Sequence, residues 1–207
     1  MQRLDHMKES ASQTAGPYVH IGLAPSRAGF DVYAQELGLD ITGPEAPGER
    51  IRVEGMVFDG TGTSIRDVLI ETWQADAAGI HPHPEDPRAA QVAPGFRGWG
   101  RVVPDFATGL WSFDTIKPGV VAGWGGRPQA PHISFWLVAR GINIGLQTRL
   151  YFADEAEANA ADPVLNLVEQ VHRRATLIAA REEREGLPVY RFDIRLQGDG
   201  ETVFLDV

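Results

Sequence analysis

The stretch QAPHISFWLVARG, residues 129–141, alternates in character from one residue to the next, and this period of two is typical of a β-strand. The alternation places five side chains on one face of that strand: His132, Ser134, Trp136, Val138 and Arg140. Two histidines two residues apart on one strand face would form half of a metal site. The second position holds Ser134, so the stretch raises the question of whether this chain binds a metal at all.

The chain from residue 50 onward contains further short alternating segments on both sides of this stretch, and turns rich in glycine and proline separate them. They cover residues 50–59, 65–76, 109–119, 146–152, 176–183, 188–198 and 201–207. The first two flank the turn GTGTS and are predicted to form a hairpin. In YRFDIRL, residues 190–196, the apolar residues Tyr190, Phe192, Ile194 and Leu196 share one face. Strands at this spacing predict an all-β fold, an antiparallel β-sandwich.

Two other regions complete the predicted organisation. Residues 154–174 read as short helices on a long connection, in which Asp162 caps a helix whose first position is Pro163. Residues 1–49 are rich in turn-forming residues and read as an extended N-terminal arm with connecting loops, which packs on the domain or on a partner. Residues 50–207 form the β-sandwich domain.

The composition excludes several classes of function. The chain has 207 residues, of which 43% are apolar, and this suffices for one domain with a sizeable core. The absence of cysteine excludes thiolate catalysis, disulfides and cysteine-bound zinc. A net charge of −9 argues against nucleic acid as the main partner. The polar N-terminus lacks a signal-like apolar segment, so a cytoplasmic location is expected.

A few polar residues are candidates for chemistry. His81 and His83 lie in a proline-rich loop with Glu85 and Asp86 close by, which suits either a metal site or an ordinary polar loop. His132 lies on a predicted core strand, where a histidine is more often satisfied by internal hydrogen bonds. Arg140 and Arg149 interrupt apolar segments, and each is expected to pair with a carboxylate, either of the protein or of a ligand.

Six segments resemble, in the same order, those of the intradiol ring-cleavage dioxygenases. They are SQTAGPYVHIG (12–22), VLIETWQADAAG (68–79), TIKPG (115–119), APHISF (130–135), RLYF (149–152) and YRFDIRLQG (190–198). The resemblance implies an antiparallel β-sandwich. It also implies a family chemistry in which non-haem Fe(III), held by two tyrosines and two histidines, promotes attack of O2 on a bound catecholate.

The iron ligands of that family do not persist in this sequence. The resemblance places His81 at the first tyrosine position, Val121 at the second, and His132 and Ser134 at the two histidine positions. Valine has no donor atom, so only His132 is an unaltered ligand and His81 is the only replacement able to bind a metal. The sequence therefore predicts a degenerate site with no metal and no catalytic residue in this chain.

In this family an iron-free α subunit pairs with an iron-bearing β subunit, and the resemblance is greatest to such an α subunit. It implies a hetero-oligomer whose β subunit holds the Fe(III). That assembly uses O2 to cleave 3,4-dihydroxybenzoate to 3-carboxy-cis,cis-muconate in aromatic catabolism through the β-ketoadipate pathway. The α-subunit residues implied near the substrate are Thr14, Gly16, Pro17 and Arg140, and the arginine is suited to pairing with the substrate carboxylate.

Two alternatives remain open at the level of sequence. The chain could be a homomeric dioxygenase in its own right, or one that uses another metal bound by His81, His83 and His132. It could instead be a non-catalytic β-sandwich module that binds an aromatic acid.

Overall fold

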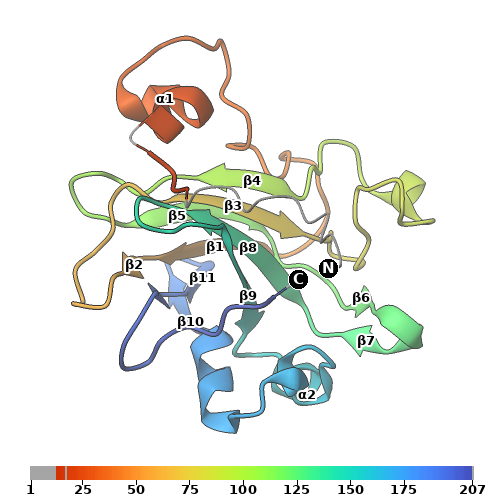
Figure 1. The fold of residues 1–207 in the computed structure, drawn as a ribbon. Coiled ribbons are helices and arrows are strands. Elements are labelled where there is room, and N and C mark those ends of the chain that lie inside the picture. Colours follow the sequence, from red (N-terminus) through yellow and green to blue (C-terminus); the bar gives the residue numbers. More distant parts are fainter. Residues whose placement is uncertain (1–12, 17, 207) are drawn as a thin grey trace, which may run out of the picture.

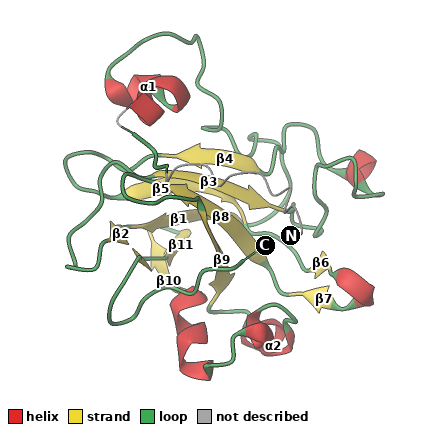
Figure 2. Ribbon diagram, in the orientation of Figure 1, coloured by secondary structure: helices red, strands yellow, loops and turns green. Residues whose placement is uncertain are grey.

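The computed structural model describes residues 13–16 and 18–206, and β-strands dominate it (Figures 1 and 2). The strands are β1 (Arg50–Gly55), β2 (Val57–Phe58), β3 (Leu69–Gln74), β4 (Trp99–Val102), β5 (Trp111–Ile116), β6 (Val121–Ala122), β7 (Pro128–Gln129), β8 (His132–Val138), β9 (Leu146–Phe152), β10 (Ile178–Arg184), β11 (Leu187–Arg191) and β12 (Ile194–Arg195). The helices are α1 (Tyr18–Leu23) and α2 (Ala156–Ala161), with 3-10 turns at Pro25–Ala28, Ala89–Gln91, Trp124–Gly126, Leu165–Leu167 and Val171–Leu177. No helix of the described residues is both long and apolar enough to cross a membrane. The prediction of a mostly-β chain is confirmed.

Eight strands are hydrogen-bonded in the order β4-β3-β8-β9-β10-β11-β1-β5. The two halves of this sheet meet at a short parallel pairing of Ile178 and Ala179 with Tyr151 and Phe152. Aromatic side chains from both halves share one core: the ring of Phe135 on β8 lies 5.6 Å from that of Trp111 on β5. The predicted antiparallel arrangement holds for most strand pairs, but the sheet is mixed, because β1 pairs with β11, β9 with β10, and β2 with β12 in parallel.

The predicted hairpin of residues 50–59 and 65–76 does not form. β1 pairs with β5 and β11, whereas β3 pairs with β4 and β8 in the other half of the sheet. The turn closes locally through the bridge of Phe58 and Ser64, and the chain then crosses to the second half. Residues 201–206 also form no strand, since only Leu205 makes a bridge, with Gln147.

Strand β8 has the predicted alternation. Ile133, Phe135 and Leu137 point into the core, while Ser134, Trp136 and Val138 are only half-buried. The strand ends at Val138, so Arg140 lies in the following turn and not on the strand face as predicted. The alternation predicted for residues 190–196 is confirmed too: Tyr190, Phe192 and Ile194 are fully buried or nearly so.

The long connection contains α2 and two 3-10 turns, as the sequence indicated. α2 ends just before Asp162, and the Asp162 carboxylate accepts hydrogen bonds from the backbone N–H groups of Val164 (2.9 Å) and Leu165 (2.7 Å). Asp162 thus accepts the N–H groups at the start of the next turn, as a capping residue does, but this 3-10 turn begins at Leu165 and not at Pro163 as predicted. The same carboxylate reaches Ala130 and Tyr151, which ties the connection to β8 and β9.

The segment before residue 50 lies against the sheet in some places and stands away from it in others. Ile41 is buried in the main core, and Ala24 packs against Leu69 and Val103. α1 lies beyond β4 in Figure 1 and is tied to the sheet: Val19 packs against the same cluster, and Arg101 of β4 donates a hydrogen bond to the carbonyl of Leu23. Several large apolar side chains of this segment are exposed: Tyr18, Ile21, Leu23, Phe30, Val32, Tyr33, Leu37 and Leu39.

Candidate functional site

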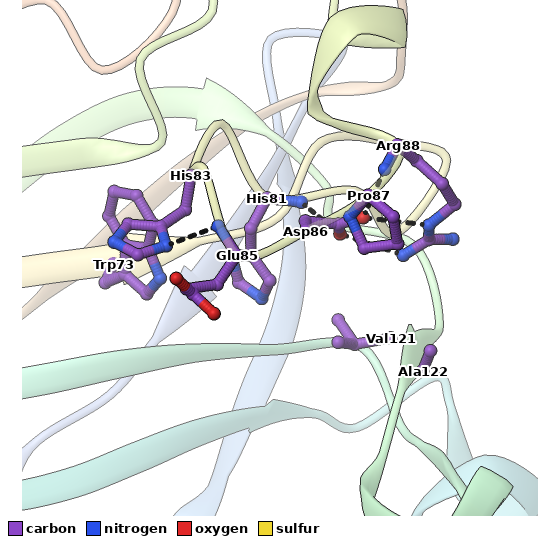
Figure 3. A pocket seen from close by; sticks show the side chains of 9 residues that line it. All are labelled: Trp73, His81, His83, Glu85, Asp86, Pro87, Arg88, Val121 and Ala122. Carbon is purple, nitrogen blue, oxygen red and sulfur yellow. Dashed lines mark hydrogen bonds and ion pairs between the residues drawn. The ribbon is translucent and has the colours of Figure 1, made fainter.

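A pocket of about 670 Å³ opens between the loop that follows β3 and the short strand β6 (Figure 3). Its lining consists of Trp73, His81, His83, Glu85, Asp86, Pro87, Arg88, Val121 and Ala122. His81 and Val121, two of the four degenerate ligand positions, therefore line one space. This volume is in the range that small-molecule sites usually have.

One wall of the pocket is aromatic. The rings of Trp73 and His81 are stacked with their centroids 5.5 Å apart and an angle of 8° between their planes. The ring of His83 meets Trp73 edge-on at 6.3 Å. Burial lowers the pKa of His81, although the nearby carboxylate of Asp86 opposes this shift. The buried Nδ1 of His81 has no hydrogen-bond partner among the described residues.

Asp86 and Arg88 hold the loop at the pocket rim. The Asp86 carboxylate accepts hydrogen bonds from Arg88 Nε (3.1 Å) and Nη2 (3.0 Å) and from the backbone N–H of His81 (3.2 Å). Arg88 Nη2 also donates to the carbonyl of Gly79. The hydrogen bonds from Arg88 hold the pKa of Asp86 at about 2. The cation and the anion therefore largely neutralise each other.

The remaining degenerate positions lie on β8. His132 is buried, and its Nδ1 forms a 2.8 Å hydrogen bond with the carbonyl of Ala130, so the expectation of an internally satisfied histidine is confirmed for this ring nitrogen. Burial lowers the pKa of His132 to about 4, and the positive charge of Arg149 contributes to this shift. Ser134 is paired with Trp73 of β3 in the sheet register.

These residues do not fit an Fe(III) ion. Within residues 13–16 and 18–206, no three histidine, aspartate or glutamate side chains are grouped so that they could hold a metal. Val121 offers no donor, Nδ1 of His83 already accepts the N–H of Glu85, and Asp86 is paired with Arg88. The alternative of a metal held by His81, His83 and His132 has no support in this geometry.

A second group of predicted site residues meets at the turn after β8. The Thr14 hydroxyl accepts a hydrogen bond from the backbone N–H of Gly141 (2.8 Å) and donates one to the carbonyl of Ala139 (3.3 Å). These two residues flank Arg140, whose Nε donates to the carboxylate of Asp67. The Arg140 side chain remains 65% exposed.

The other two predicted substrate-binding residues, Gly16 and Pro17, follow Thr14 closely in the sequence. A Cβ atom added at Gly16 would meet nothing within 4 Å, so the backbone there is open to close approach. Pro17 lies outside the described residues. Arg149 was expected to pair with a carboxylate, but it donates instead to the amide oxygen of Gln129 at 2.6 Å.

Sequence reasoning missed three residues of these sites. Trp73 forms the ring wall and Arg88 fixes the rim, and both flank the loop whose histidines were noticed. An aromatic residue just before a loop with two histidines was the available signal for Trp73. Asp67 has no local signal, because 73 residues separate it from Arg140.

Comparison with known proteins places this geometry in a family. Residues 31–198 match the family model described as a dioxygenase. The chain is 53% identical over 203 residues to the protocatechuate 3,4-dioxygenase alpha chain of Pseudomonas putida, and the match covers 98% of each chain. It is 35% identical over 192 residues to the protocatechuate 3,4-dioxygenase beta chain of Burkholderia cepacia, covering 83% of this chain and 80% of that one.

Solved structures agree on the fold. The 3-chlorocatechol 1,2-dioxygenase of Rhodococcus opacus superposes with a TM-score of 0.60 at 23% identity, covering 90% of this chain and 71% of that one. The family model and the α-chain relative each span most of the sequence, including the segments that carry the degenerate positions. This chain belongs to the intradiol ring-cleavage dioxygenase family.

Proposed function

We propose that this chain is the iron-free α subunit of a protocatechuate 3,4-dioxygenase. It pairs with a β subunit that holds the Fe(III), and the assembly cleaves protocatechuate with O2 in the cytoplasm. The observation that carries the proposal is the 53% identity to an α chain over nearly the whole length. The replacement of two ligand positions by Val121 and Ser134 supports it, because neither suits the ferric site of the family.

An N-terminal arm followed by a sandwich domain is an organisation that suits an α subunit bound to a β subunit. We propose that residues 1–49 act as an arm and residues 50–207 as a sandwich domain, whose two half-sheets pack around the shared core. Eight large apolar side chains of the arm are exposed between Tyr18 and Leu39. An apolar surface of this kind is typical of an interface, and we assign it to the β subunit.

Association with the β subunit gives the first test. Val32 of the arm and Val171 after α2 are exposed to the same extent, 66%, which makes them a matched pair. Val32→Asp is expected to weaken α/β association at least tenfold, because an unpaired carboxylate would be buried at the interface. Val171→Asp should have little effect. Copurification with a tagged β subunit, followed by titration, measures both, and equal behaviour of the two variants would remove the arm from the interface.

The junction of the arm with the turn after β8 supports a role in substrate binding. Thr14 and the turn are joined by two hydrogen bonds, so Gly16 follows two residues after a point beside Arg140. Arg140 uses Nε for Asp67, and neither Nη atom contacts another described residue within hydrogen-bonding distance. A guanidinium whose two Nη groups are both free is suited to the carboxylate of protocatechuate. Gly16 would let the substrate approach the backbone, and Pro17 would stiffen the arm.

In the α/β complex, Arg140→Ala is expected to weaken protocatechuate binding by about 1.5–3 kcal/mol, because a charge-assisted hydrogen bond is lost. This corresponds to a roughly 10- to 150-fold rise in the apparent dissociation constant. Arg97 is a matched control, since it is exposed and paired with Asp40. Steady-state kinetics of R140A and R97A make the comparison. Normal kinetics in R140A would reduce Arg140 to a structural partner of Asp67.

A further inference from the structure

We infer that the guanidinium of Arg149 serves as a built-in cation among the four degenerate ligand positions, and that its positive charge keeps metal ions out of this chain. The side chains at those positions do not fit Fe(III), and an arginine held between them is a second barrier, which opposes any metal cation. The inference goes beyond the proposed function and does not rest on it, because it concerns side chains of this chain alone.

Strand register brings Arg149 to two of the degenerate positions. On the antiparallel pair β8 and β9, Arg149 lies directly opposite Ser134. Directly opposed residues share one face of a sheet, so the two side chains lie beside each other. Nη1 of Arg149 donates a 2.6 Å hydrogen bond to the amide oxygen of Gln129, and Gln129 in turn lies opposite Val121 on the pair β7 and β6. The arginine therefore bridges from the Ser134 position to the strand pair that carries Val121.

The other two degenerate positions hold histidines that feel the same charge. Burial is the main cause of the lowered pKa of His132 and of His81, and the positive charge of Arg149 acts in the same direction on each ring. The two rings are also close enough to affect each other, and His81 lines the same pocket as Val121 (Figure 3). All four degenerate positions thus lie within reach of one arginine side chain.

Arg149 keeps its charge free of a counter-ion. Among the residues that the structure describes, it forms no ion pair, and the acceptor of its hydrogen bond is the uncharged amide of Gln129. A site built for a metal cation does the opposite, since it brings anionic ligands together around a vacant centre.

The carboxylates near the two histidines are committed elsewhere. Asp76 accepts backbone N–H groups of its own loop, Asp86 is paired with Arg88, and Asp162 accepts four hydrogen bonds. Glu85 is exposed, so water screens its charge. Asp86 and Asp76 act more strongly on His81 than Arg149 does, whereas at His132 the arginine outweighs Asp162. The barrier is therefore strongest on the side of the site that β8 forms.

The experiment titrates the full chain, purified without a histidine tag, with Co²⁺ near neutral pH. Calorimetry and the visible absorption of bound Co²⁺ measure the affinity, and circular dichroism checks that each variant is folded. Arg149→Gln removes the charge and keeps a hydrogen-bonding amide, so it is expected to bind Co²⁺ at least tenfold more tightly than the unaltered chain. Adding His132→Gln should abolish this gain, because it removes one of the two remaining ligands.

Two further arginine variants are the matched controls. Arg149→Lys keeps the positive charge and should bind Co²⁺ no more tightly than the unaltered chain. Arg97→Gln removes an exposed cation that is paired with Asp40, and it should also have no effect. No gain in folded R149Q, or an equal gain in R149K or R97Q, would overturn the inference.

Ser134→His tests the barrier with Arg149 in place. The substitution adds a third imidazole to the strand face that carries His132, and three imidazoles suffice for a divalent metal ion. We expect S134H to bind Co²⁺ less than tenfold more tightly than the unaltered chain, and S134H/R149Q to bind it at least a hundredfold more tightly than S134H. Tight binding by S134H alone, or weak binding by the double variant, would contradict the assignment. Because no β subunit or iron is present, failure here would leave the proposed function untouched.

Discussion

Replacing Asp162 with alanine is expected to lower the free energy of unfolding by about 3–5 kcal/mol. The Asp162 carboxylate is fully buried and accepts four hydrogen bonds, from the backbone N–H groups of Ala130, Val164 and Leu165 and from the hydroxyl of Tyr151. Each buried donor that loses its acceptor costs roughly 1–3 kcal/mol, and partial entry of water reduces the sum. Urea unfolding followed by circular dichroism measures the loss.

The effect should extend to the degenerate site. Asp162 holds the N–H of Ala130, and the carbonyl of Ala130 in turn bonds to Nδ1 of His132. Asp162→Asn should lower the free energy of unfolding less than Asp162→Ala does. The amide oxygen of asparagine can still accept hydrogen bonds, although its NH₂ group would face one of the N–H or O–H donors. Asp199→Ala, at an exposed position, is the control and should change stability by less than about 0.5 kcal/mol. Equal stability of D162A and D199A would show that the buried network contributes nothing.

Acidification is expected to destabilise the chain through His132. Its pKa is about 4 in the folded chain and about 6.5 when unfolded, so both states are neutral above pH 6.5. As the pH falls from 6.5 toward 4, the unfolded state takes up a proton that the folded state does not, and stability declines. The gap corresponds to about 3 kcal/mol, lost almost completely by pH 4.

Stability curves of His132→Gln measured between pH 8 and pH 4 isolate this contribution. The glutamine has no titrating ring, so H132Q should lose less stability than the unaltered chain across that interval. His172→Gln, which removes an exposed histidine, should follow the unaltered chain. Parallel curves for the unaltered chain and H132Q would refute the assigned pKa. In the α/β complex at pH 8, H132Q should retain normal ring cleavage, because His132 takes no part in the chemistry of the β subunit's iron site.

The local features of the fold could be predicted from the sequence, but the strand pairing could not. The alternation along β8 and through residues 190–196 determines which side chains are buried, and Asp162 followed by Pro163 indicated a helical turn close by. Residues 50–59 and 65–76 look like a hairpin because turn signals are local. In the structure β1 pairs with β5 and β11, and β3 with β4 and β8, all distant along the chain, and such pairing depends on the packing of the two half-sheets around Phe135.

For the sites, too, residues with a local sequence signal could be predicted, and residues that join the site only through the fold could not. The residues that carry recognisable segments, Thr14, His81, His132 and Arg140, could be singled out because their types and surroundings resemble a family. The groups that complete the sites, Trp73 and Asp67, became visible only when β3 and the turn after β8 were placed in space. A single ion pair such as that of Arg140 with Asp67 leaves no pattern in one sequence.

The most direct measurement is of iron content and protocatechuate-dependent O2 uptake, made on the purified chain alone and after coexpression with a β subunit of the family. We expect neither iron nor uptake for the chain alone, because Val121 and Ser134 occupy ligand positions, and we expect both iron and uptake for the coexpressed pair. Stoichiometric iron and turnover in the isolated chain would contradict it, and His81 and His132 would then be the first residues to replace.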